Sequence, residues 1–336
     1  MIGVSLGGSF PQGVPAAATL LAAARAEEAA GYDAVWSGDH VMMHSPIVEA
    51  VTLLAAFAAV TQRVRLGTAV YLLPLRHPTI VAKTFAGLDY VSDGRLIFGV
   101  GVGGEYPKEF EASGVSVRER GARTDEGLEI VRRLWSEPCV SFEGRFYRFA
   151  DVALAPPPVQ RPHPPIWIGG RSEAAVRRTA RFANGWLAYM ATPEQVRSGL
   201  ARIADLAAGF GRDPRAVAGG LLVFAFVGRD RDTARARVVA DLSMRYNQPF
   251  DRLVDRYCAF GTPAQCAERL TAFLDAGPRL DLDLAKPVEH DLEEALLHPD
   301  VREHILLGEH VREEEPQEAL VTDLEHDVLA IDQPLP

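Results

Sequence analysis

The chain has 336 residues, of which 48% are hydrophobic and 24% are charged, and its net charge is -10. This composition is typical of a globular protein with a sizeable core and excludes global disorder. The longest apolar stretches, residues 51–60 and 221–227, are far shorter than the roughly 20 residues that cross a bilayer.

The N-terminal residues, MIGVSLGGSF, lack the basic and apolar segments of a secretory signal, so we expect a cytoplasmic protein. A short apolar run followed by an Ala-rich amphipathic helix then recurs three times, which predicts three βα units. Their strands and helices are predicted in alternation at residues 2–6, 15–30, 34–36, 46–60, 64–71 and 78–91.

The alternation continues along the chain. Further strands are predicted at residues 96–100, 166–168, 185–190, 221–227 and 280–284. Helices are predicted over residues 125–135 and 173–182, and the last helix ends at Gly277. Eight strands alternating with helices predict an α/β fold of the (β/α)₈ TIM barrel type over residues 1–285. A doubly wound sheet is less consistent, because no G-x-G-x-x-G turn follows the first strand.

Residues 138–165 interrupt this repeat. The segment from residue 140 to 149 predicts a hairpin with its turn at Glu143-Gly144, and the proline-rich stretch that follows predicts an extended chain. We expect an insertion in the barrel that forms part of its mouth.

Active-site residues of such barrels lie where the strands end. Asp39 and His40 follow the second predicted strand and offer a carboxylate and an imidazole, which titrates near neutrality as acid/base catalysis requires. A structural role for His40 remains an alternative. His44 lies four residues further on, but no third ligand follows with recognisable spacing, so we expect no metal site.

The fifth predicted strand leads through Gly169, Gly170, Arg171 and Ser172 directly into a helix. The free amide groups of the helix start and the Arg171 guanidinium are suited to a phosphate, although a Gly-Gly pair also occurs in simple tight turns. Several large side chains either wall a ligand or belong to the core, namely Met42, Met43, Tyr71, Phe85, Tyr106 and Trp186.

Seven blocks over about residues 1–278 resemble, in order and spacing, the signatures of the luciferase-like monooxygenase superfamily. They are GYDAVWSGDH, RLGTAV, LRHP, SDGRL, GVGVG, ERGAR and PIWIGG. The Gly-Asp-His triplet and the stretch GVGVGGEYPKEF are most similar to the branch that uses the deazaflavin coenzyme F420.

The resemblance implies a barrel whose mouth holds the tricyclic ring of the cofactor. Asp39 and His40 then lie beside the ring, and Ala69-Val70 matches the position of a non-prolyl cis peptide behind it. Further cofactor contacts are implied for Gly103 and Gly104 near the ring edge, and for Gly169, Gly170, Arg171 and Ser172 at the phosphate. Arg177 and Arg178 follow on the outer rim, where they could pair with the phosphate and the carboxylates of the F420 tail.

The implied activity is hydride transfer between F420 and a small organic substrate, with His40 as the first acid/base candidate and Glu105 as the second. Two departures bear on this assignment. Two glycines rather than one precede Glu105, and His44 replaces an aromatic residue of sugar-phosphate-oxidising relatives. An FMN-dependent monooxygenase is the alternative within enzymes, and a cofactor-binding barrel without turnover is a further one. We expect a homodimer.

Residues 286–336 hold 15 acidic and 3 basic residues, so this acidic C-terminal extension carries a charge of -12 and the remainder +2. A nearly neutral body without a Lys/Arg block argues against a nucleic-acid partner. Five of the nine histidines also lie here. The extension is interpreted as a solvated tail, an oligomerisation arm or a histidine-rich metal-binding segment.

Overall fold

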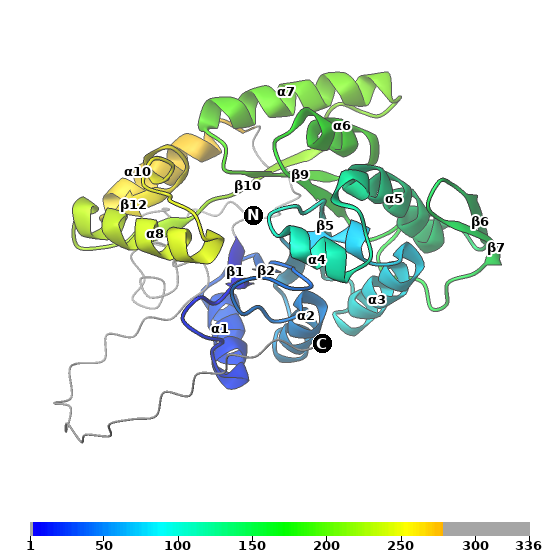
Figure 1. Cartoon of the computed structure of the whole chain (residues 1–336), viewed down its shortest axis with the longest axis horizontal. Helices are drawn as coiled ribbons and strands as arrows, with labels where there is room; N and C mark the ends of the chain where they lie inside the picture. The colour runs from blue at the N-terminus through cyan, green and yellow to red at the C-terminus, as the bar shows by residue number, and fades with distance from the viewer. Residues whose placement is uncertain (1–2, 278–336) are drawn as a thin grey trace, which may run out of the picture.

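The structure is a computed structural model that describes residues 3–277 (Figure 1). The strand predicted at residues 280–284 and the extension predicted over residues 286–336 lie outside the described residues.

Seven strands form one curled parallel sheet in chain order, with helices around its outside (Figure 1). The strands are β1 (Gly3–Gly7), β2 (Ala34–Ser37), β3 (Arg65–Thr68), β5 (Leu96–Gly101), β8 (Ile166–Gly169), β9 (Gly185–Tyr189) and β10 (Ala218–Leu222). The principal helices of this part are α1 (Ala17–Ala29), α2 (Ala50–Val60), α3 (Pro78–Val91), α5 (Arg120–Ser136), α6 (Glu173–Phe182) and α7 (Pro193–Gly209). The predicted βα repeat is therefore confirmed from β1 to β9, whereas helix α7 was not among the predicted helices.

The core lies between the sheet and the surrounding helices. All six residues of β5 are buried, as expected for a parallel strand covered on both faces. Phe98 of β5 packs against Phe85 of α3 and Trp135 of α5, with ring centroids 4.4 and 5.4 Å apart. The Trp135 indole N–H donates to the carbonyl of Ala82 at 2.9 Å, so this polar atom is satisfied inside the core.

The third predicted strand, residues 64–71, is divided in two. β3 ends at Thr68, and a two-residue strand β4 (Tyr71–Leu72) pairs with β5 before the short helix η1 (Leu73–Leu75). Between them the Ala69–Val70 peptide bond is cis, as the family resemblance implied.

β6 (Val140–Glu143) and β7 (Arg148–Val152) form the antiparallel hairpin that the sequence predicted. Its position differs from our expectation. The stacked rings of Phe142 and Phe149 pack against the main core cluster, and the hairpin lies beyond α5 at the edge of the molecule (Figure 1). The hairpin is therefore not part of the mouth, because its apolar residues cover helices rather than the strand ends.

The C-terminal part of the described chain, after β9, differs from the prediction. The seventh predicted strand, residues 221–227, is split between β10 and β11 (Ala225–Val227), and β11 pairs with β12 (Ala259–Gly261) in a separate parallel sheet. The helices here are α8 (Arg231–Tyr246), α9 (Val254–Tyr257) and α10 (Pro263–Leu274). Within residues 3–277 no pairing joins β12 to β1, so a closed eight-stranded barrel is not seen. A strand of three residues has few backbone groups with which to pair on both sides.

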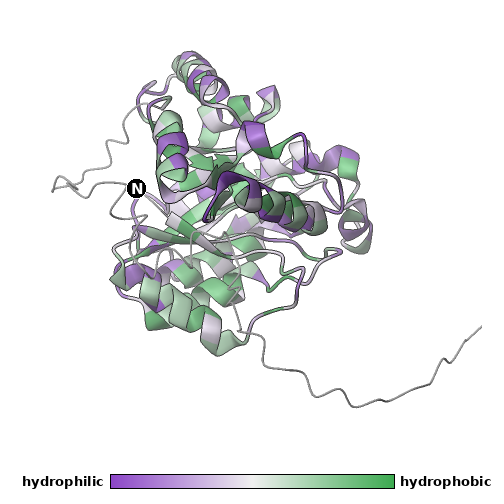
Figure 2. Cartoon of the chain, turned by 90° about the vertical axis from the view of Figure 1, so that its left-hand side faces the viewer, coloured by the Kyte–Doolittle hydropathy of each residue, from purple (hydrophilic) through white to green (hydrophobic). Residues whose placement is uncertain are grey.

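Helix α2 contains no charged residue, and the helices at the bottom of the molecule are largely hydrophobic in colour (Figure 2). Over the described part of the chain, no helix combines the length and apolar character needed to span a membrane.

Candidate active site

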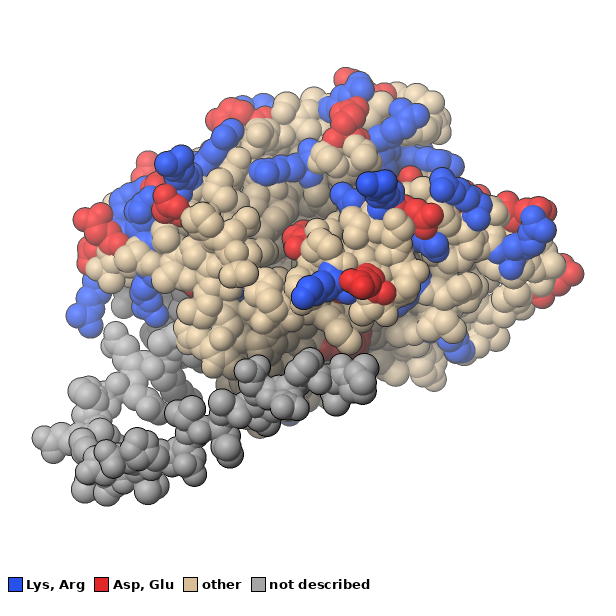
Figure 3. All heavy atoms as spheres, in the orientation of Figure 1, with Lys and Arg blue, Asp and Glu red and all other residues tan. Residues whose placement is uncertain are grey.

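A pocket opens where the carboxyl ends of the strands meet, and the space-filling view shows the same face hollowed near its centre (Figure 3). Eight of the eleven residues predicted from the sequence line it: Asp39, His40, Ala69, Val70, Gly103, Glu105, Gly169 and Gly170. Gly104, Arg171 and Ser172 are not among its lining residues. Most of the candidates thus lie together where the strands end, and their roles remain predictions.

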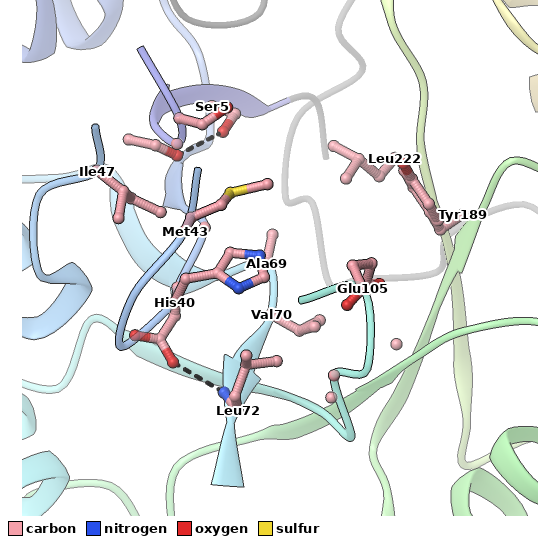
Figure 4. Close-up of a pocket in the computed structure, with 18 of the residues that line it drawn as sticks. Ser5, His40, Met43, Ile47, Ala69, Val70, Leu72, Glu105, Tyr189 and Leu222 are labelled. Atoms are coloured by element: carbon pink, nitrogen blue, oxygen red, sulfur yellow. Dashed lines mark hydrogen bonds between the residues drawn. The ribbon is translucent and has the colours of Figure 1, made fainter. Parts of the chain in front are cut away.

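His40 projects into the pocket from the loop after β2 (Figure 4). Its Nδ1 lies 3.1 Å from each carboxylate oxygen of Glu109, which is fully buried in the short helix α4 (Pro107–Ala112). One of these oxygens also accepts the backbone N–H of Val41 at 3.2 Å. Burial opposes the charged imidazolium, but the hydrogen bond and charge of Glu109, with Glu105 and Asp39, outweigh it and raise the pKa of His40.

Asp39 is buried beside His40 and pairs with Arg76, which lies just after η1. The two guanidinium nitrogens donate to the two carboxylate oxygens at 2.5 and 2.8 Å, and the backbone N–H of Leu72 donates at 2.9 Å. Burial raises the pKa of Asp39, whereas Arg76 and the Leu72 N–H favour its carboxylate. This bidentate pair fixes the end of β2 to the segment that follows the cis peptide.

Glu105 lies across the pocket from His40, and the two side chains face the same space (Figure 4). The residues before it adopt backbone conformations that favour glycine, with φ of +62° at Gly103 and +127° at Gly104. A Cβ on Gly104 would lie 3.3 Å from Nε of Arg120, so Arg120 packs directly on this loop. The second glycine thus belongs to a turn that carries Glu105 to the pocket rim.

Val70 forms the floor of the pocket between two glycines. A Cβ at Gly101 would lie 2.2 Å from one Val70 methyl group, and a Cβ at Gly169 would lie 2.5 Å from the other. Both strands therefore need glycine at this level to admit Val70. Its side chain provides an apolar surface flanked by bare backbone, which suits a planar ligand.

The predicted phosphate loop is only partly directed at the pocket. Ser172 is the N-cap of α6, and its hydroxyl accepts the N–H of Ala175 at 3.2 Å. Arg171 donates to the carbonyl of Met190, and its guanidinium lies 5.4 Å from the ring centroid of Tyr257. The Trp186 indole N–H donates to the carbonyl of Gly170 at 2.6 Å and orients the loop.

The expectation that Arg178 belongs to the outer rim is wrong. Arg178 is buried and pairs with Asp125 of α5 at 2.7 Å, because it lies on the face of α6 that packs against that helix. Arg177 is exposed and lies over the ring of Phe210 at 5.4 Å.

The end of helix α8 closes the pocket beside β1. Arg245 Nη1 donates to the carbonyl of Ser9 at 3.1 Å, and Nη2 lies 3.2 Å from the Asp241 carboxylate. His44 contacts the carbonyl of Arg245 through Nε2 at 2.7 Å. Side-chain contacts thus connect α8 to the loops after β1 and β2, on the side where residues 3–277 show no strand pairing.

Most of the large side chains singled out as possible ligand contacts belong elsewhere. Met43 lines the pocket, whereas Tyr71, Phe85 and Trp186 are buried in the core. The aromatic residues that line the pocket are Tyr189, Phe224 and Tyr246, none of which was a candidate in the sequence analysis.

Sequence reasoning also missed Glu109, Arg76 and Arg245. The first two lie inside the blocks GVGVGGEYPKEF and LRHP, which identified the family without assigning roles to these residues. Arg245 lies in helix α8, and nothing in the sequence of this helix indicated that it reaches the site.

The model of the luciferase-like monooxygenase family matches residues 3–280. An F420-dependent hydroxymycolic acid dehydrogenase of Mycobacterium tuberculosis is 32% identical over 226 residues, or 65% of this chain and 61% of that protein. An FMNH₂-dependent dimethylsulfone monooxygenase of Pseudomonas putida is 33% identical over 197 residues, or 58% of this chain and 53% of that protein. Among solved structures, a monooxygenase from Streptomyces bottropensis superimposes with a TM-score of 0.71 at 30% identity, covering 82% of this chain and 89% of that one.

Proposed function

The chain belongs to the luciferase-like monooxygenase family, and we propose that it is an oxidoreductase that uses coenzyme F420 to transfer a hydride to or from a small organic substrate. The observation that carries the proposal is the pairing of His40 with the buried Glu109 at the pocket. It gives a substrate oxygen a proton donor or acceptor of defined orientation.

The described residues fit a flat cofactor. Val70 and the glycines beside it would lie against the ring, with Ala69 behind them and Gly103 and Gly104 at its edge. At the other end, the first turn of α6 offers N–H groups and the positive end of the helix dipole to a phosphate. Gly169 and Gly170 would allow the phosphate to approach, with Ser172 at the N-cap and the Arg171 guanidinium close by.

When bound, F420 supplies or accepts the hydride. The chain positions a proton. Because Nδ1 of His40 is held by Glu109, Nε2 is the ring nitrogen with which His40 can reach a substrate oxygen. In the direction of carbonyl reduction, Nε2–H donates the proton that forms the product hydroxyl. In the direction of alcohol oxidation, neutral His40 accepts it.

Two further carboxylates support this arrangement. Asp39, held by Arg76 and the Leu72 N–H, fixes the backbone from which His40 projects. Glu105 adds negative charge that favours the imidazolium, and it is the second acid/base candidate because its side chain faces the same space.

An FMN-dependent monooxygenase is the second candidate. The relative from Pseudomonas putida matches this chain as well as the F420-dependent relative does, at 33% against 32% identity. A ring that lies against Val70 and a phosphate at α6 are requirements common to both cofactors, so the alternative has the same structural support at those positions.

Turnover distinguishes these proposals. The purified protein is mixed with F420 and a panel of alcohols, and with reduced F420 and the matching ketones, while the visible absorbance of F420 is followed. We expect an absorbance change that depends on substrate. Turnover only with reduced FMN and oxygen would favour the monooxygenase, and cofactor binding without any turnover would favour a non-catalytic barrel.

A further inference from the structure

We infer that the pocket takes a neutral, largely apolar substrate, that a second oxygen of this substrate hydrogen-bonds to Ser9, and that phosphorylated sugars bind poorly. The inference rests on the proposed function, because it names the substrate class of the same site. It is carried by the apolar wall, by the pairing of the charged side chains and by an unsatisfied hydroxyl.

The wall opposite His40 is apolar and aromatic. Tyr189 and Leu222 face His40 across the pocket, while Met43 and Ile47 lie on the His40 side (Figure 4). The wall continues through Phe224 and Tyr246, whose rings meet edge to face with centroids 6.3 Å apart, and Tyr189 meets Phe224 in the same manner at 6.1 Å. Burial raises the pKa of Tyr189 well above its ordinary value, so the wall adds no negative charge at neutral pH. Such a surface favours the body of an apolar ligand.

The charges at the pocket do not favour a substrate phosphate in addition to the cofactor phosphate proposed at α6. Among the described lining residues, Arg245 is the one lysine or arginine, and its guanidinium already contacts Asp241 and the carbonyl of Ser9. A phosphate would have to compete with Asp241 for Arg245, and it would face the carboxylate of Glu105. Under these conditions, the free energy needed to desolvate a doubly charged phosphate exceeds the interaction energy that the site can provide.

Ser9 lies at the pocket with a buried hydroxyl. Its Oγ has no hydrogen-bond partner among the described residues, and the residue is 5% exposed. The backbone around it is fixed, since the Ser9 carbonyl accepts from Arg245, Ser9 pairs with Ile47, and the Phe10 N–H donates to Pro46 at 2.8 Å. The hydroxyl is therefore held in place with its donor and acceptor capacity unused.

A buried polar atom without a partner is rare in folded proteins and usually marks a ligand or water position. A hydroxyl can donate to a carbonyl oxygen or accept from another hydroxyl, so Ser9 can bind a second oxygen of either kind. The substrate would thus be held at two polar points, His40 at the reacting oxygen and Ser9 at the second oxygen, with its apolar body against the aromatic wall.

Calorimetric titration of the F420-loaded protein tests the inference with three probes. Styrene glycol is neutral and carries two hydroxyls, phenethyl alcohol carries one, and glucose 6-phosphate is anionic. We expect styrene glycol to bind at least tenfold tighter than glucose 6-phosphate. Ser9→Ala should weaken the binding of styrene glycol about fivefold, because one neutral hydrogen bond is lost. The affinity for phenethyl alcohol, which has no second hydroxyl, should stay unchanged.

Ser92→Ala is the matched control. The Ser92 hydroxyl is also buried, but it donates to the carbonyl of Asp89 at the end of α3, away from the pocket. This substitution should leave the affinity for both alcohols unchanged. Ser9→Ala should leave the melting temperature unchanged or raise it, since it removes an unsatisfied buried group.

Three results would overturn the inference: glucose 6-phosphate binding as tightly as styrene glycol, unchanged affinity of Ser9→Ala for styrene glycol, or weakened F420 binding in Ser9→Ala, which would assign Ser9 to the cofactor. If the wild-type protein did not bind F420, the proposed function would fail instead. The same probes titrated into cofactor-free protein would still test the inference.

Discussion

Nδ1 of His40 lies 3.1 Å from both carboxylate oxygens of Glu109, although 69 positions separate the two residues in the sequence. Glu109 is fully buried, whereas the His40 side chain keeps 16% of its surface exposed at the pocket. The buried carboxylate orients the imidazole and raises its pKa, and the exposed edge of the ring is left for a ligand. The first two predictions depend on this pair.

Replacing His40 by alanine should lower turnover about 10²-fold or more, because the proton donor and acceptor of the reaction is removed. The effect should appear in kcat, with F420 affinity close to wild type. Steady-state kinetics with a confirmed substrate provide the measurement. Unchanged turnover would remove His40 from the mechanism.

Glu109→Gln should lower the pKa of His40, because it removes the negative charge that raises it. In the direction of carbonyl reduction the protonated ring is active, so the alkaline limb of the pH–rate profile should move to lower pH. Glu111→Gln, an exposed change on the same helix, is the control and should leave the profile in place.

We also predict that the His40–Glu109 pair makes the free energy of unfolding depend on pH. Because the pKa of His40 is higher in the folded state, the contribution of the charged pair is complete below the unfolded pKa of about 6.5 and is lost as the pH rises through the folded pKa. The difference in unfolding free energy between wild type and Glu109→Gln should therefore be largest in mild acid. A difference that grows with pH would contradict this assignment of charge.

Arg76→Met should destabilise the protein by about 3 kcal/mol or more, because it leaves the Asp39 carboxyl buried without its cation. Urea unfolding measures the loss. Adding Asp39→Asn to Arg76→Met should recover part of it, since the uncompensated charge is then gone. If the double variant is no more stable than Arg76→Met, the ion pair is not the cause.

Arg171→Gln should weaken cofactor binding about fivefold, because its guanidinium lies beside the proposed phosphate position. Arg177→Gln is the matched control, since Arg177 lies over the ring of Phe210, one turn into helix α6, which follows Arg171. Fluorescence titration measures both affinities. An equal loss of cofactor affinity in the two variants would indicate a general effect of positive charge rather than a specific contact of Arg171.

We predict a homodimer that involves α3 and the uncharged helix α2. Ile80 and Tyr90 of α3 are each 64% exposed although both are large and apolar or aromatic. Light scattering should give twice the mass of one chain, and Ile80→Asp should lower it to that of a monomer. Leu274→Asp, at an exposed apolar residue of α10, should leave the dimer intact.

Local sequence patterns predicted most of the α/β architecture, but the closed eight-stranded barrel that they also predicted is not seen within residues 3–277. The helices and long strands follow from apolar periodicity, which is strong over ten or more residues. β12 was missed because three residues, one of them glycine, are too few to show a period. The hairpin was recognised from its own turn residues, but its position depends on which surface its phenylalanines cover, and a local pattern does not contain that information.

The candidate site was predicted to a similar extent. Asp39, His40 and Glu105 could be found because they follow predicted strands, and strand ends converge in this fold. Their partners could not, because Glu109 and Arg76 reach the site through a helix and a turn whose positions depend on the whole ring. Ser9 follows the first predicted strand, yet only the packing around it shows that its hydroxyl has no partner in the described part of the chain.

Titration of the cofactor-free protein with F420 and with FMN tests the central claim most directly. Both cofactors share a ribityl phosphate, so a common site should bind either one, and the difference in affinity reports which ring and extension the site prefers. We predict that F420 binds at least tenfold tighter, a difference of about 1.4 kcal/mol. Tighter binding of FMN, or protein that carries FMN when purified from a host without F420, would contradict the proposal and favour the monooxygenase.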